Sequence, residues 1–175
     1  MMRCLAFLIC LFALGACGFT PVHYHSSQTP EGETVRAEMS RIAIDVIAQR
    51  QGQELRNHLM DRLYSGGIPT APAYRLDVDI NDPYISQRGI TQEATTTREQ
   101  IVYTAEATLV DTQSNEVLFT RPFRALATYN VLAGQYATLV SREQAQERAL
   151  ELMAADIERA LALYFNETRI TEQAQ

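Results

Sequence analysis

The most constraining feature of this sequence is the strict alternation of apolar and polar residues between Tyr74 and Ile80, which reaches Tyr84. The two alternating sets are Tyr74, Leu76, Val78, Ile80 and Tyr84 against Arg75, Asp77, Asp79 and Asn81. Because successive side chains of a strand point to opposite faces of a sheet, the pattern predicts a strand with one face in the core and the other in water. The rest of the chain must therefore cover one side of a sheet.

Three other segments have the residue pattern of strands. Arg41–Ile47 is rich in β-branched residues, and Ile101–Asp111 has apolar residues at alternate positions. Glu116–Tyr129 alternates in the same way after the turn-forming stretch Asp111–Asn115, so the last two strands are predicted to form a hairpin. The polar, threonine-rich stretch Gln87–Gln100 is expected to connect strands.

Two segments have helical periodicity. Within Gln53–Tyr64 the leucines recur every four residues, which predicts a helix with one apolar face, and Gly66-Gly67 follows as a C-cap. Ser141–Gln144 has the spacing of a capping box and predicts the start of a second helix. Its apolar stripe comprises Ala145, Ala149, Met153, Ile157, Ala160, Leu161 and Tyr164. The sequence becomes polar after Phe165, so residues 166–175 are expected as a frayed, polar C-terminal tail.

These elements follow one another in the order β-α-β-β-β-α. We therefore predict an α+β fold, a two-layer sandwich in which a four-stranded, mostly antiparallel sheet carries two helices on one face. The predicted domain spans residues 39–165, because no linker or internal repeat divides it. A chain of 175 residues, 46% of them apolar, can bury a core that needs neither a metal nor a disulfide.

The charge of the chain limits its partners. Its 15 basic residues against 21 acidic ones give a net charge of -6, which argues against the basic surface that nucleic-acid binding needs. All of the basic residues are arginine. Arginine suits bidentate recognition of phosphate, but a nucleotide bias in the source genome would also replace lysine throughout, so this observation alone assigns no ligand.

The N-terminus has the pattern of a secretory signal peptide. Arg3 precedes the apolar stretch Cys4–Leu14, which is too short to span a bilayer, and the small pair Gly15-Ala16 follows. Residues 1–16 are therefore predicted to be removed on export. Leu14-Gly15-Ala16-Cys17 resembles the bacterial lipobox, whose cysteine is acylated and becomes the new N-terminus.

Cys17 is the residue that the sequence assigns to a lipid anchor. It is the only cysteine after residue 16, and an odd cysteine in an exported protein needs an explanation. Acylation supplies one, and a stray cysteine behind an ordinary cleaved signal is the alternative. Gly18 stands where an aspartate would retain a lipoprotein at the inner membrane, so the expected location is the periplasmic side of the outer membrane. Residues 17–38 are expected as an acylated N-terminus and flexible tether.

No pattern in the sequence is typical of a catalytic or metal centre. Nucleophile elbow, phosphate loop, H-E-x-x-H and C-x-x-C motifs are all missing. The side chains that could suggest a metal are His23 and His25, His58 and Asp61, and Asp77, Asp79 and Asp82. The first pair has no third ligand nearby, the second is typical of a solvated helix surface, and the aspartates lack the other residues of a calcium loop. We therefore expect neither an enzyme nor a metal or cofactor site.

The chain combines three further features. They are the lipobox leading into Cys17–Pro21, the element order, and the run Ala127–Val131 that continues through Tyr136–Val140 into Arg142–Leu150. In combination they resemble the LptE family of lipopolysaccharide-assembly lipoproteins, in its alphaproteobacterial form. The resemblance covers nearly the whole mature chain. It implies a subunit that sits inside a large outer-membrane β-barrel of the LptD type, plugs it, helps it fold and assists delivery of lipopolysaccharide to the outer leaflet.

Binding of lipopolysaccharide itself needs basic side chains. From Val117 to Ser141 the only charged residues are Arg121 and Arg124. A guanidinium pair can hold the phosphates of lipid A by charge-assisted hydrogen bonds, so these two arginines are the predicted lipopolysaccharide-binding residues. The alternatives are that Arg121 lies along Phe119 and Phe123, and that Arg124 pairs with an acid on a neighbouring strand.

A second class of function stays open beside this one. A freestanding periplasmic lipoprotein that binds a lipid without a barrel partner would need a deep apolar cavity between helices and sheet. The small residues Ala145, Ala149 and Ala160 disfavour such a cavity, because they let the two layers approach closely.

Overall fold

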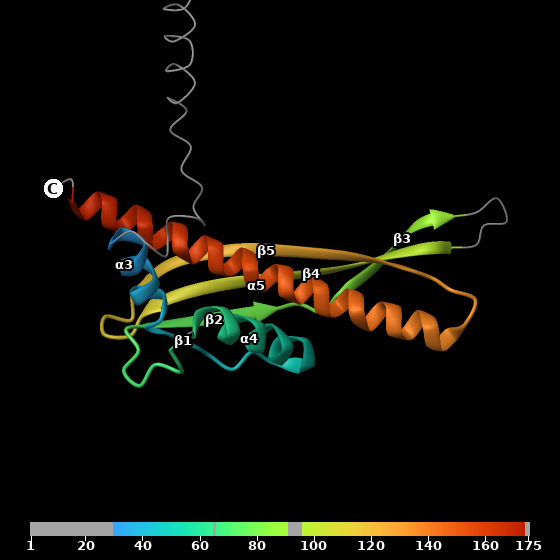
Figure 1. The fold of residues 1–175 in the computed structure, drawn as a ribbon, viewed down its shortest axis with the longest axis horizontal. Coiled ribbons are helices and arrows are strands. Elements are labelled where there is room, and N and C mark those ends of the chain that lie inside the picture. Colours follow the sequence, from blue (N-terminus) through green and yellow to red (C-terminus); the bar gives the residue numbers. More distant parts are fainter. Residues whose placement is uncertain (1–29, 65, 91–95, 174–175) are drawn as a thin grey trace, which may run out of the picture. The chain divides into compact units, whose positions relative to one another are not determined.

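The computed structural model describes residues 30–64, 66–90 and 96–173 (Figure 1). The described elements are α3 (Pro30–Met39), β1 (Ile42–Ile44), α4 (Gln49–Leu63), β2 (Tyr74–Ile80), β3 (Tyr84–Ile90), β4 (Thr96–Asp111), β5 (Val117–Asn130) and α5 (Gln135–Gln173). Residues from Ala37 onward form one compact unit, the body of the protein.

The strands form one mixed sheet with β4 at its centre. One side of β4 pairs antiparallel with β5, from Arg98↔Asn130 to Val110↔Val117. The other side pairs antiparallel with β2 toward its end and with β3 toward its start, and β1 adds to β2 in parallel. The α+β class and the mostly antiparallel sheet are therefore confirmed, but the sheet has five strands rather than the predicted four.

The additional strand results from an interruption at Asn81–Pro83. Ile80 pairs with Ala105 and Tyr84 with Val102, so one strand contains an extra residue, as in a β-bulge. Pro83 lacks the N–H that would continue the ladder. The extra residue reverses the alternation of side chains, so Tyr84, which the sequence pattern placed with the core residues, is 51% exposed.

The stretch Gln87–Gln100, expected only as a connection, contains the end of β3 and the start of β4. The two strands pair through this stretch with register shifts around Gly89. The residues in this stretch are mostly polar and do not alternate with apolar ones, so the sequence pattern did not identify them as strand residues. Both strands are therefore longer than predicted.

Helices α4 and α5 lie on one face of the sheet, as predicted (Figure 1). The core lies between the two layers and contains Ile42, Ile47, Leu55, Leu59, Leu76, Ile101, Tyr103, Leu109, Leu150, Met153, Ile157 and Leu161, all less than 2% exposed. In the predicted stripe of α5, Ala145 and Ala149 are fully buried. Small side chains at these positions bring α5 close to its neighbours.

Helix α5 is longer at both ends than predicted. It begins at Gln135, so the Ser141–Gln144 capping box lies inside the helix, and it continues to Gln173 through residues expected as a frayed tail. The earlier start is stabilised by Thr138, whose hydroxyl accepts a hydrogen bond from the Leu132 N–H at 2.9 Å and donates to the Leu132 carbonyl at 3.1 Å. This contact ties the preceding loop to the first turn of α5.

The expected tether, residues 17–38, ends in helix α3. This helix starts at Pro30, a residue favoured at the first helical position, and has Arg36 in its last turn, where a cation complements the helix dipole. Residues 17–29 lie outside the described residues. Within the described ranges, no helix combines the length and the apolar character that crossing a bilayer requires.

The second face of the sheet, which we call the uncovered face, lies opposite α4 and α5. Its side chains include Arg75, Asp77, Asp79, Glu106, Thr108, Thr120, Arg124 and Thr128. This face is the solvent-exposed face that the alternation of apolar and polar residues predicted. Among the described strands, β5 forms an edge of the sheet. Its pairing with β4 continues through Pro122 without a register shift. A proline is tolerated at an edge where its nitrogen faces away from the neighbouring strand.

Candidate functional site

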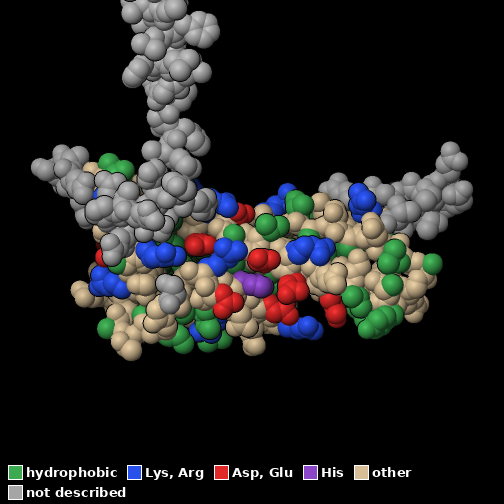
Figure 2. All heavy atoms as spheres, viewed as in Figure 1, with side chains coloured by type: hydrophobic (Ala, Val, Ile, Leu, Met, Phe, Trp, Pro, Cys, Tyr) green, Lys and Arg blue, Asp and Glu red, His purple; other side chains and the backbone are tan. Residues whose placement is uncertain are grey.

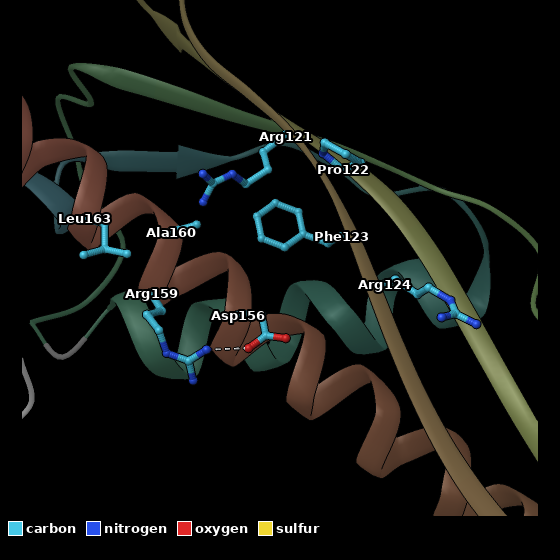
Figure 3. Close-up of a pocket in the computed structure, with 8 residues that line it drawn as sticks. All are labelled: Arg121, Pro122, Phe123, Arg124, Asp156, Arg159, Ala160 and Leu163. Carbon is cyan, nitrogen blue, oxygen red and sulfur yellow. Dashed lines mark hydrogen bonds and ion pairs between the residues drawn. The ribbon is translucent and has the colours of Figure 1, made fainter.

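A groove lies between the edge strand β5 and the C-terminal half of α5 (Figure 3). It has a volume of about 560 Å³. Its lining residues are Arg121, Pro122, Phe123, Arg124, Asp156, Arg159, Ala160 and Leu163. Both arginines that we predicted from the sequence to bind lipopolysaccharide therefore border this groove.

Strand and helix periodicity bring these side chains together. Arg121 and Phe123 are two residues apart on β5, so both point toward α5 (Figure 3). On α5, Asp156, Arg159 and Leu163 recur at intervals of three or four residues and therefore share the helix face that borders β5. The groove thus combines residues from two elements of distant sequence position.

Arg121 lies along an aromatic side chain. Its guanidinium carbon is 5.8 Å from the centroid of the Phe119 ring, and that ring lies 5.8 Å from the ring of Tyr164 on α5. Among the ion pairs of the described residues, none involves Arg121. Because Arg121 is also exposed, its N–H groups are accessible to an anion.

Arg159 provides the second guanidinium of the groove. Its Nη1 lies 2.6 Å from the Asp156 Oδ1, and the two side chains are 51% and 45% exposed. An exposed pair of this kind contributes at most about 1 kcal/mol to stability. The guanidinium has further N–H groups, so Arg159 can bind an anion while it holds Asp156.

Arg124 does not share the face of Arg121. Its side chain points away from Phe123 and toward the uncovered face (Figure 3), where its Nη2 donates to the Tyr84 hydroxyl at 3.0 Å. The guanidinium pair that the sequence predicted is therefore divided between the two faces of β5. The groove pairs Arg121 with Arg159 instead. The sequence did not identify Arg159 as a site residue. An Asp-x-x-Arg spacing is common on helices, and it does not indicate that Arg159 lies beside Arg121 of β5.

This arrangement suits an amphipathic anion. The guanidinium groups can donate charge-assisted hydrogen bonds to phosphate or carboxylate oxygens. Phe123, Ala160 and Leu163 provide apolar surface beside them. The described residues include no group of His, Cys, Asp and Glu side chains that could hold a metal ion.

His58 and Asp61 border a second groove, of about 460 Å³, between α4 and α5. Figure 2 shows the histidine among acidic and basic side chains on this surface. Glu143 and Glu147 line the same groove from α5. The surroundings are those of a solvated, mixed-charge helix surface.

Among the described residues, the other side chains singled out from the sequence line neither groove. Asp77 and Asp79 are exposed on the uncovered face, and Asp82 accepts a hydrogen bond from the Gln51 amide at 3.2 Å. The candidates that lie outside the described residues are Cys17, His23 and His25.

Comparison with known proteins identifies the family. The family model described as "LptE: Lipopolysaccharide-assembly" matches residues 39–161, which is most of the chain. The chain belongs to the LptE family. Membership of the LptE family confirms the resemblance found in the sequence and places the chain among proteins of lipopolysaccharide assembly. No sequence among the curated proteins matches the chain.

Several solved structures share the fold. A candidate lipoprotein from Caulobacter crescentus is 23% identical with a TM-score of 0.61, and the match covers 75% of this chain and 96% of that one. A minor lipoprotein from Acinetobacter baumannii is 14% identical with a TM-score of 0.53, covering 70% and 90%. An uncharacterized lipoprotein B from Nitrosomonas europaea is 13% identical with a TM-score of 0.53, covering 71% and 81%. At these identities the similarity establishes the fold.

Proposed function

We propose that this LptE-family protein is an outer-membrane lipoprotein, anchored through an acylated Cys17, that plugs and helps to assemble the β-barrel of a lipopolysaccharide translocon. The family match supports the role in lipopolysaccharide assembly. The lipobox Leu14–Cys17 supports the anchor. In this proposal the partner is an outer-membrane barrel of the LptD type, and the protein assists insertion of lipopolysaccharide into the outer leaflet from the periplasmic side.

The groove between β5 and α5 is the observation that carries the proposal. Lipopolysaccharide combines phosphates with acyl chains, and the groove combines the guanidinium groups of Arg121 and Arg159 with the apolar side chains of Phe123 and Leu163. A phosphate can accept charge-assisted hydrogen bonds from the arginines while the acyl part contacts the apolar wall. Arg121 and Arg159 are therefore the proposed phosphate ligands, and Arg124 borders the site from the other face.

The uncovered face of the sheet supports the plug. A barrel wide enough to pass a glycolipid has a polar lumen that must be filled to prevent leakage. Threonines and charged residues such as Asp77, Asp79 and Glu106 make up most of the exposed side chains of this face, which also includes Leu126. A polar surface of this kind is compatible with a water-lined barrel wall.

The packing of the core argues against the freestanding lipid carrier. Met153, Ile157 and Leu161 of α5 are fully buried against the other elements. An acyl chain inserted among them would have to displace close-packed side chains. Contact with lipid is therefore expected at the surface groove.

Affinity isolation after gentle detergent extraction tests the barrel partner. We expect a stoichiometric outer-membrane barrel protein to accompany the wild-type chain, and metabolic fatty-acid labelling to mark wild type but not the Cys17→Ser variant. Recovery of the labelled protein without a partner would favour a freestanding lipid-binding lipoprotein. An unlabelled wild-type chain would contradict the anchor.

A further inference from the structure

One end of the body exposes large apolar side chains. There β3, the start of β4, the end of β5 and the start of α5 lie together (Figure 1), and Figure 2 shows hydrophobic side chains gathered where α5 begins. From Ala125 to Ser141 the sequence contains no charged residue, although 21% of the chain is charged. The residues that we call the apolar end are between 43% and 79% exposed, and they are Tyr84, Ile85, Leu126, Leu132, Tyr136 and Leu139.

The apolar end includes side chains from both faces of the sheet. Strand pairing places Tyr84 and Leu126 on either side of Val102, so these three residues share the uncovered face. Val102 is only 1% exposed, which shows that its neighbours form an apolar cluster over it. Ile85 pairs with the core residue Ile101 and therefore points to the face that carries α4 and α5. Apolar side chains thus project from opposite sides of the same end.

The helical side of the apolar end is held in one conformation. The Thr138 hydroxyl satisfies both the N–H and the carbonyl of Leu132, at 2.9 and 3.1 Å. At the base of the loop, the Arg142 Nε donates to the Tyr129 hydroxyl at 2.9 Å, and that hydroxyl also bonds Glu99. A surface that is already ordered loses little conformational freedom when a partner covers it, and this favours a stable contact.

The arrangement of these side chains indicates the shape of the partner. With roughly 150–250 Å² for a whole large side chain, the six residues expose on the order of 600 Å². One side of a stable protein–protein interface buries about 800 Å², so the apolar end is large enough to form most of one. A bilayer or a flat protein surface contacts one side of a body and would leave the other apolar side chains in water. A concave wall that surrounds the end covers both sides.

We propose that the apolar end is the part of this protein that an apolar band in the lumen of the barrel partner surrounds. This inference rests on the proposed function, which encloses the body in a barrel, and it names the surface that makes the contact. Barrel interiors are mostly polar, which suits the charged part of the uncovered face. Apolar lumen-facing residues are expected where the wall meets Tyr84, Leu126 and the start of α5, because permanent interfaces have apolar cores.

Photo-cross-linking from both sides tests whether one wall surrounds the apolar end. Tyr84 and Tyr136 are replaced, one at a time, by photoreactive p-benzoylphenylalanine in the full-length protein. Each protein is irradiated in the membrane, and its cross-linked peptides are identified by mass spectrometry. We expect both positions to cross-link to the same outer-membrane barrel protein, at apolar lumen-facing residues of different strands. Cross-links from either position to lipid or to a second copy of this chain would overturn the proposal.

A triple substitution measures how much the apolar end contributes to the complex. Leu126→Gln, Leu132→Gln and Leu139→Gln are combined in the full-length protein, and the barrel protein that accompanies it after gentle detergent extraction is quantified. We expect roughly tenfold less barrel protein than with wild type, or a greater loss, because a few central apolar residues carry most of the binding energy of an interface.

The matched control combines Ile68→Gln, Leu152→Gln and Ile170→Gln, which remove apolar side chains that lie outside the apolar end and are 54–69% exposed. This control should recover as much barrel protein as wild type. Equal recovery by the two triple variants would overturn the proposal. If wild type itself recovers no barrel protein, the proposed function fails instead, so the two failures are distinguishable. Circular dichroism verifies folding, and the cross-linking decides the question if a triple variant is unfolded.

Discussion

Replacement of Arg121 by alanine should weaken binding of lipopolysaccharide to this protein. The Arg121 guanidinium lies on the groove, is exposed, and has no ion pair among the described residues. A hydrogen bond to a charged group contributes about 1.5–3 kcal/mol, and exposure places Arg121 at the lower end of this range. A loss of about 1.5 kcal/mol corresponds to roughly tenfold weaker binding.

Asp156→Asn should have the opposite effect. The Asp156 carboxylate lies 2.6 Å from Arg159 and repels a phosphate that approaches the groove. Removal of this charge frees the Arg159 guanidinium for the ligand. Since an exposed ion pair amounts to about 0.2–1 kcal/mol, binding should strengthen by a factor of up to roughly five.

The assay is displacement of fluorescent lipopolysaccharide from the full-length protein in detergent at fixed ionic strength. Arg124→Ala is the matched control, because Arg124 follows Arg121 closely on β5 but points to the other face. Circular dichroism verifies that each variant is folded. The reasoning would be refuted if Arg124→Ala and Arg121→Ala weakened binding equally, or if Asp156→Asn bound less tightly than wild type.

Two further predictions concern stability. In Gly52→Ala the new Cβ would lie 2.6 Å from the Ile47 Cγ2 and 3.0 Å from the Ile47 carbonyl carbon. Overpacking of roughly 1–3 kcal/mol should exceed the gain of about 1 kcal/mol in helix propensity. Thermal unfolding should give a lower Tm for Gly52→Ala but not for Gly66→Ala, where nothing lies within 4 Å; equal Tm values would contradict this. Burial, and then the Glu38 carboxylate, raise the pKa of Tyr74 from 10.0 to about 12. The folded state therefore keeps this proton longer than the unfolded chain, and the resulting stability is present below pH 10 and lost as the pH rises toward 12. Denaturant titrations over this range should show a steeper decline for wild type than for Tyr74→Phe, and parallel declines would exclude this role of Tyr74.

Apolar periodicity was sufficient to predict the elements that line the core. Leu55, Leu59 and Leu63 are all buried, and the alternation of β2 matches its burial residue by residue. These patterns exist because one face of each element must leave water. The strand β3 and the start of α5 at Gln135 had no such signal, since the first contains polar residues and the second depends on a bond between Thr138 and Leu132.

The groove could be predicted only in part. The side of β5 on which Arg121 lies follows from its alternation with Phe119 and Phe123, and this was one of the alternatives considered from the sequence. The same alternation places Arg124 on the other side. Arg159 could not be found, because the sequence of α5 does not reveal which of its faces borders β5.

The position of Pro122 has a consequence for how the protein behaves on its own. β5 is a strand of 14 residues at the edge of the sheet, and such edges recruit strands from other copies. A strand added to β5 would lack a hydrogen-bond donor at Pro122. If that strand were β5 of a second copy, Arg121 and Arg124 would also lie close to the same positive charges on the other copy. Pro122 and the two arginines therefore disfavour the addition of a further strand at the β5 edge, and copies of the protein brought close together should be less prone to aggregate through this strand.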